Sequence, residues 1–152
     1  MTSASTPSPL TGRSPSPEET GDRDSEVNNP AVLLPVIEDL CRFRDELGPN
    51  HVKVAETWNS LGLIRLYMQH NESAAIKCHE EAIKIYKMNE VSALQLAVTL
   101  GDLGACYERV CEPEHALGIY QEALELLVVS KVSPSHRVTQ SIVRSLARLK
   151  RE

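Results

Sequence analysis

Residues 96–127 read LAVTLGDLGACYERVCEPEHALGIYQEALELL, and residues 54–86 read VAETWNSLGLIRLYMQHNESAAIKCHEEAIKIY. The two stretches begin 42 residues apart and share small residues at matching positions. A period of about 20–50 residues with small residues at fixed places predicts a stacked helical repeat. The shared positions are Leu61-Gly62 and Leu103-Gly104, then Ala75 and Ala82 in the first copy and Ala116 and Ala123 in the second.

Around these copies, apolar residues recur at helical spacing, and β-branched residues are scattered among strong helix formers. The pattern predicts an all-α protein of about six helices with no strand. The expected helices cover about residues 31–48, 51–69, 73–87, 91–110, 113–129 and 134–150.

Glycine and proline punctuate this pattern. Gly48-Pro49 is a C-terminal stop signal, and Glu112-Pro113 and Ser133-Pro134 place a proline at a first helical position. Pro35 leaves two alternatives for the first helix, because the helix either begins near Pro35 or is kinked there.

Residues 1–29 differ from the rest of the chain: they are rich in Ser, Thr and Pro and then acidic. Such a stretch has too little apolar area to offset the entropy of ordering, so a disordered tail is expected. Its four Ser/Thr-Pro steps are candidate phosphorylation sites, although a Ser/Pro-rich composition alone produces such steps. The candidate residues are Thr6, Ser8, Ser14 and Ser16.

The composition argues against several other classes of protein. The net charge of −5 disfavours broad nucleic-acid binding. No run of apolar residues is long enough for a membrane-spanning helix, and no secretory signal begins the chain. The four cysteines include no C-x-x-C pair, so free thiols in a reducing compartment are expected, with no metal site and no cofactor. We therefore expect a cytoplasmic protein; an acid-free start to the tail leaves organelle targeting as an alternative.

The second copy resembles a tetratricopeptide repeat, with that family's W-L-G-Y-A-F-A positions at Leu100, Leu103, Gly104, Tyr107, Ala116, Tyr120 and Ala123. The first copy matches at Trp58, Leu61, Gly62, Ala75 and Ala82, but it carries one extra residue between Gly62 and Ala75 and has His79 where an aromatic residue is usual. One added residue in the turn between helices would absorb this difference. The resemblance implies a short right-handed superhelical solenoid of antiparallel helix pairs, in which Gly104 and Ala116 let two helices approach closely.

The long period is similar to that of kinesin-light-chain-like repeats, through Leu47-Gly48-Pro49-Asn50-His51 and the starts at Ala93 and His136. The expected organisation is a tail over 1–29 and a repeat domain over 30–152. Within the domain we expect a leading helix at 31–48, repeat 1 at 50–88, repeat 2 at 91–130 and a terminal helix at 133–151.

Proteins with this repeat bind peptides or helices on the concave face lined by the first helix of each pair. The resemblance implies a groove with an apolar end, a small-residue floor and a basic end, suited to an apolar ligand residue followed by an acidic one. For the apolar groove residues, packing between helices is the alternative, and for the arginines a solvated surface is. The implied groove residues are Asn59, Leu63, Leu66, Tyr67, Gly101, Ala105, Glu108, Arg109, Arg144 and Arg148.

The predicted function is therefore a non-catalytic adaptor that binds a protein or peptide partner. No nucleophile lies in a recognisable motif with a histidine and a carboxylate, so no enzyme is expected. Self-assembly through an open end of the stack, or a place within a longer array, is the alternative. RNA binding is less favoured, because only the last helix is basic.

Overall fold

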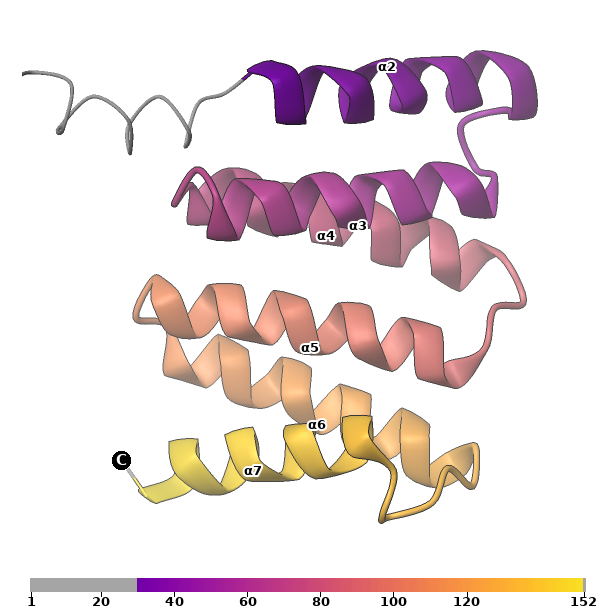
Figure 1. Ribbon diagram of the computed structural model, residues 1–152. Helices are drawn as coiled ribbons and strands as arrows, with labels where there is room; N and C mark the ends of the chain where they lie inside the picture. The colour runs from indigo at the N-terminus through magenta and orange to yellow at the C-terminus, as the bar shows by residue number, and fades with distance from the viewer. Residues whose placement is uncertain (1–29, 152) are drawn as a thin grey trace, which may run out of the picture.

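The computed structural model describes residues 30–151, and this part of the chain is all-α, as the apolar spacing predicts. Six helices follow one another with short connections, and successive helices run in opposite directions (Figure 1). The helices are α2 (Pro30–Leu47), α3 (Val52–Tyr67), α4 (Glu72–Met88), α5 (Ala93–Arg109), α6 (Pro113–Val129) and α7 (Arg137–Arg151). The expected tail over 1–29, with Thr6, Ser8, Ser14 and Ser16, lies outside the described residues.

The helices form a stack in which each packs against the next, and α5 also contacts both α3 and α7. Figure 1 shows α3, α5 and α7 side by side on one face, with α4 and α6 behind them. We call the first set the α3–α5–α7 layer. α2 lies at one end of the stack and α7 at the other.

Close approach within each helix pair depends on a glycine. A Cβ atom added at Gly62 would lie 2.7 Å from Cε1 of His79, and one added at Gly104 would lie 2.7 Å from Cε1 of Tyr120. Both rings are buried, so each fills the space that its glycine leaves open. The two pairs α3–α4 and α5–α6 are thus built on the same contact.

The extra residue of the first copy lies in the turn, as expected. Residues 68–71 connect α3 to α4, whereas only residues 110–112 connect α5 to α6. Three connections contain a non-glycine residue in the left-handed region, with φ of 50° at His70, 62° at Cys111 and 58° at Lys131. Gly48 ends α2 with φ of 93°, as a helix stop signal should.

One predicted helix start is wrong. α7 begins at Arg137, and Ser133-Pro134 instead forms a turn in which His136 N–H donates to the Ser133 carbonyl at 2.9 Å. Nδ1 of His136 then accepts from the backbone N–H of Val138 at 3.2 Å. His51 repeats this arrangement at the start of α3, accepting from Lys53 N–H at 3.1 Å. In both places Pro-x-His is the motif, so the histidine caps the helix and the proline belongs to the turn before it.

The first helix excludes one of the two alternatives for Pro35. α2 already begins at Pro30, and Pro35 lies inside it on an exposed side. The helix therefore does not start at Pro35. One face of α2 packs through Leu33, Ile37 and Leu40 against α3.

Two apolar clusters make up most of the core. One cluster runs from Ile83 of α4 through α5 and α6 to Ile142 and Leu146 of α7. The other joins α2, α3 and α4, and Trp58 packs against it beneath α2. Leu96 of α5 packs against both clusters and so connects them.

Candidate functional site

The predicted groove residues lie on α3, α5 and α7, which the fold does bring side by side. Their surroundings divide them into three groups. Leu66 is fully buried, several others already bind residues of this chain, and the rest remain accessible in part. The groove as predicted is therefore not one open surface.

Leu66 does not line a groove, and its assignment to one is wrong. It has no exposed surface and packs in a small cluster with Ala75 of α4 and Cys106 of α5. Leu66 thus contributes to the core between helices, which was the alternative for the apolar residues.

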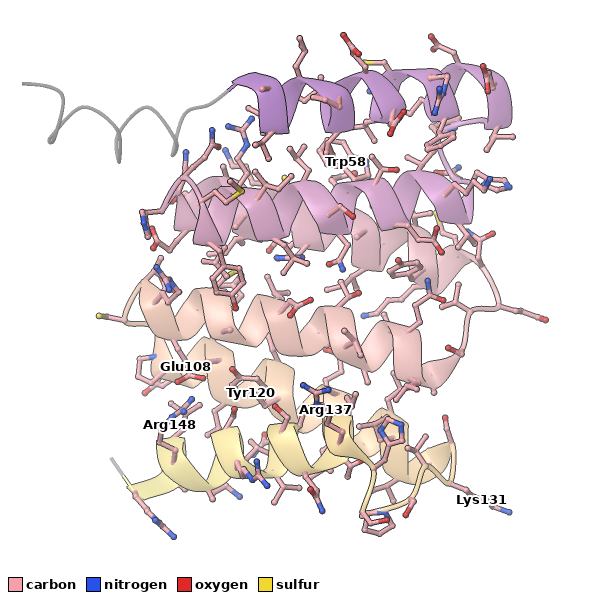
Figure 2. All side chains as sticks on the ribbon, in the orientation of Figure 1. Trp58, Glu108, Tyr120, Lys131, Arg137 and Arg148 are labelled. Carbon is pink, nitrogen blue, oxygen red and sulfur yellow. The ribbon has the colours of Figure 1, made fainter. Side chains whose placement is uncertain are left out.

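One of the two arginines of the expected basic end, Arg148, already binds an acidic residue of this chain. Nη2 of Arg148 donates to both carboxylate oxygens of Glu108, at 2.8 and 2.7 Å. The Tyr120 hydroxyl donates to Oε1 of the same carboxylate at 2.6 Å. Figure 2 shows these three side chains meeting where α5, α6 and α7 come together. An acidic ligand residue would have to displace Glu108 to reach Arg148, so this pair links α7 to α5 and Arg148 is not available as a free cation.

Two other predicted residues take part in contacts that tie helices together. Arg109 pairs with Glu72 of α4, with 3.3 Å between Nε and Oε1. Asn59 has its Oδ1 2.7 Å from Nδ1 of His79. These contacts link α5 to α4 and α3 to α4.

Asn59 belongs to a polar chain that reaches into the α3–α5–α7 layer. With the imidazole donating through Nδ1 to Asn59, the Asn59 amide group donates to the carboxylate of Asp102 on α5. Burial lowers the pKa of His79 to about 4, so the ring is neutral near pH 7. Burial raises the pKa of Asp102 to about 6, and the hydrogen bond from Asn59 opposes that rise. Nε2 of His79 is buried with no partner among the described residues.

Asp102 also lines a cleft between α5 and α7, with a volume of about 340 Å³. The cleft has an apolar wall and two charged groups, the carboxylate of Asp102 and the guanidinium of Arg137. We call it the α5–α7 cleft. Its residues are Ala97, Val98, Asp102, Arg137, Val138, Ser141 and Ile142.

No model of a known protein family matches the chain, and no curated protein matches it.

Among the predicted residues, Tyr67 is exposed, and Leu63 and Ala105 are partly buried on the α3–α5–α7 layer. Arg144 is exposed but lines a different groove, between α6 and α7. Asp102 and Arg137, which form the charged part of the α5–α7 cleft, were not among the predicted site residues.

A local signal for Asp102 does exist. It is the only charged residue in the stretch from Ala93 to Tyr107. Such a carboxylate falls beside the buried face, where it needs a partner. Arg137 carries no comparable signal, because its position depends on the late start of α7.

Within residues 30–151, no helix has both the length and the apolar character to cross a bilayer. The same residues hold no group of three or more histidine, cysteine, aspartate or glutamate side chains placed to bind a metal ion. Cys41 and Cys111 are exposed free thiols, and Cys78 and Cys106 are buried ones.

Proposed function

We propose that this chain is a tetratricopeptide-type interaction module, a short right-handed solenoid that holds a segment of a partner protein against the α3–α5–α7 layer. The observation that carries the proposal is the repeated contact of Gly62 with His79 and Gly104 with Tyr120. Two helix pairs with the same glycine–ring contact, followed by α7 in the place of a third first helix, are what stacked repeats require.

The α5–α7 cleft is the best candidate for the ligand contact. Val98 is an exposed apolar residue at its edge, and Arg137 has no ion pair among the described residues. A suitable ligand segment would place an apolar residue beside Val98 and Val138 and an acidic residue near Arg137. It would thereby cover the exposed valine and pair with the guanidinium. The proposed ligand class is the one expected from the sequence, but Arg137 takes the place of Arg148 as the residue that would contact the acidic ligand residue.

A non-catalytic role suits the state of the thiols. Burial raises the pKa of Cys106 to about 12 and raises that of Cys78, so neither is a ready nucleophile. Unbridged thiols at Cys41 and Cys111 suit a reducing compartment such as the cytoplasm.

Site-specific photocrosslinking tests the proposed site. A benzophenone amino acid replaces Ser141 in the cleft, or Gly118 on the exposed back of α6 as the matched control. In native extract, we expect the probe at 141 to capture a partner segment with an apolar and then an acidic residue. Arg137→Glu should abolish this capture without changing the helical content of the protein.

Two results would contradict the proposed binding site. If the probe at 118 captures the same segment with equal yield, or Arg137→Glu leaves capture unchanged, the α5–α7 cleft is not the binding site.

A further inference from the structure

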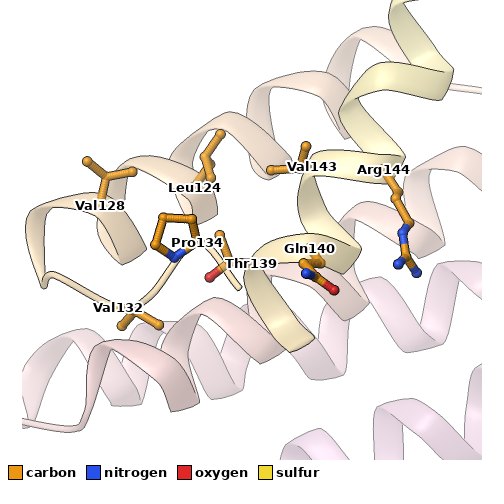
Figure 3. Close-up of a pocket in the computed structure, with 8 residues that line it drawn as sticks. All are labelled: Leu124, Val128, Val132, Pro134, Thr139, Gln140, Val143 and Arg144. Carbon is orange, nitrogen blue, oxygen red and sulfur yellow. The ribbon is translucent and has the colours of Figure 1, made fainter. Parts of the chain in front are cut away.

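The end of the stack at α7 carries an open apolar groove of about 500 Å³ between α6 and α7 (Figure 3). Val128 is 65% exposed and Val143 is 45% exposed, so large apolar side chains face solvent there. We call this surface the α6–α7 groove. Its residues are Leu124, Val128, Val132, Pro134, Thr139, Gln140, Val143 and Arg144.

The repeat itself indicates what kind of element covers such a groove. Leu146-Ala147 of α7 corresponds to Leu103-Gly104 of α5, which places Val143 where α5 has Leu100. Leu100 is almost fully buried, and Gly104 lies against the Tyr120 ring, because α6 covers that face of α5. On α7 the corresponding Val143 and Ala147 are exposed. The uncovered face is thus shaped for one more antiparallel helix.

Thr139 gives a second, independent indication. It is 5% exposed and lines the groove, yet its hydroxyl has no hydrogen-bond partner among the described residues. Two other buried threonines of this layer, Thr57 and Thr99, donate to the carbonyls of Lys53 and Gln95. A buried hydroxyl without a partner favours an incoming group that supplies one.

The charge of α7 restricts the occupant. Arg144 lies at the rim of the groove and has no ion pair among the described residues. α7 carries five basic residues and no acidic one, a net charge of +5; the bases are Arg137, Arg144, Arg148, Lys150 and Arg151. A second α7 in the groove would bring like charges together, so pairing of two α7 helices is disfavoured.

α2, at the opposite end of the stack, has the complementary properties. A face separate from the one that packs on α3 carries Leu34, Glu38, Cys41 and Asp45, at the spacing of one helical stripe. Leu34 is 52% exposed, and the other three are exposed as well. The helix has a net charge of −2, from Glu38, Asp39, Asp45 and Glu46 against Arg42 and Arg44.

We propose that α2 of a second copy of this chain docks in the α6–α7 groove. The second copy then continues the stack, with its α2 covering α7 as α6 covers α5. Because α2 and α7 lie at opposite ends of one molecule, the contact is head-to-tail. A dimer therefore still has one unoccupied α6–α7 groove and one undocked α2, at which further copies can add. This contact is separate from the α5–α7 cleft and does not depend on the proposed ligand.

The test measures the mass of the full chain by sedimentation equilibrium between about 1 and 200 µM, because association follows mass action. The wild-type average mass should rise with concentration beyond that of a dimer, and added salt should reduce it. Leu34→Asp and Val143→Asp each place a charge on an exposed position, so the folded state should be retained, as circular dichroism will verify. Each variant alone should remain monomeric.

Mixing the two variants provides the decisive control. Leu34→Asp keeps a working groove and Val143→Asp keeps a working α2, so a 1:1 mixture should form a dimer and nothing larger. A wild-type chain that stays monomeric throughout the range overturns the proposal. Assembly that Val143→Asp abolishes but Leu34→Asp leaves intact also overturns it, because α2 is then not the occupant. Lys77→Asp, an exposed charge reversal on α4, should behave as wild type.

Discussion

Gly104 lies so close to the ring of Tyr120 that a methyl group has no room between them. An added Cβ would lie 2.7 Å from Cε1 and 2.8 Å from Cζ, and the ring is held by its hydrogen bond to Glu108. We expect Gly104→Ala to lower the free energy of unfolding by about 1–3 kcal/mol through overpacking.

Gly118 supplies the matched control within α6. Nothing lies within 4 Å of a Cβ added there, so Gly118→Ala should raise the free energy of unfolding by about 0.5–1 kcal/mol. Urea denaturation followed by circular dichroism measures both variants. If Gly104→Ala and Gly118→Ala changed the free energy of unfolding in the same direction, the helix pair would not depend on the Gly104–Tyr120 contact.

His79 and Asp102 should affect stability in opposite directions as the pH falls. The pKa of His79 is about 4 in the folded state against an ordinary 6.5, so the unfolded state gains a proton first and stability is lost between those values. The pKa of Asp102 is about 6 against an ordinary 3.8, so here the folded state gains the proton first and stability rises over that range. Between about pH 6 and 4 the two contributions nearly cancel.

Asp102→Asn should separate these two contributions. The amide keeps an acceptor for Asn59 and removes a buried charge, so the free energy of unfolding at pH 7 should rise by on the order of 1–2 kcal/mol. The variant should then lose stability more steeply than wild type toward about pH 4, because only the His79 contribution remains. Urea midpoints across this range test it, with exposed Glu90→Gln as the control. Parallel pH profiles for Asp102→Asn and wild type would contradict the assignment.

At the scale of a helix, the connections hold residues in a conformation that glycine adopts more easily. Cys111 and Lys131 follow the C-terminal ends of α5 and α6 with positive φ. We expect Cys111→Gly and Lys131→Gly each to raise the free energy of unfolding by about 0.5–1 kcal/mol. Ser130→Gly, whose φ is −84°, is the neighbouring control and should give no gain. A gain at Ser130 equal to that at Lys131 would mean that the left-handed backbone is not the cause.

The docking of α7 depends in part on one ion pair. Arg148 is 59% exposed and Glu108 20% exposed, so the pair is partly screened by solvent. A double-mutant cycle with Glu108→Gln and Arg148→Gln should give a coupling energy of about 0.5–1 kcal/mol that decreases as salt is added. A coupling near zero at low salt would show that apolar packing alone holds α7.

Helices were predictable from the sequence because apolar spacing and glycine or proline punctuation are local signals. The start of α7 was misplaced because Ser133-Pro134 looks like a cap and a first turn, whereas the capping atom is Nδ1 of His136. Contacts between helices have no such local signal. Glu108 and Arg148 are 40 residues apart, and nothing near either one indicates the other.

The candidate site was predicted to the level of its helices and not of its side chains. The resemblance to tetratricopeptide repeats implied that the first helix of each pair lies on one layer, but it did not distinguish a buried stripe from an exposed one, and Leu66 lies on the buried side. Asp102 and Arg137 come together only because α5 and α7 pack side by side. Such pairings are set by tertiary packing, which periodicity along one helix does not report.

Across the whole molecule, two apolar clusters stabilise the stack, and each joins a different set of helices. Leu61 belongs to the cluster of α2, α3 and α4, and Leu127 to the cluster that extends to α7. Each is nearly or fully buried, so Leu61→Ala and Leu127→Ala should each cost about 2–5 kcal/mol. Because each helix contacts mainly its neighbours in the stack, each substitution should reduce hydrogen-exchange protection mainly in its own cluster. Equal loss of protection along residues 30–151 in both variants would show one fully cooperative unit.

Trp58 is the only tryptophan of the chain, and it lies between α2 and α3 at one end of the stack (Figure 2). Its ring borders a cleft shared with Arg44 of α2 and Lys84 of α4. Detachment of α2 would expose the indole to water, whereas detachment of α7 at the opposite end would leave the residues around the indole unchanged. The intrinsic fluorescence of the protein therefore serves as a position-specific optical reporter, whose emission wavelength follows the first helix and is insensitive to the last.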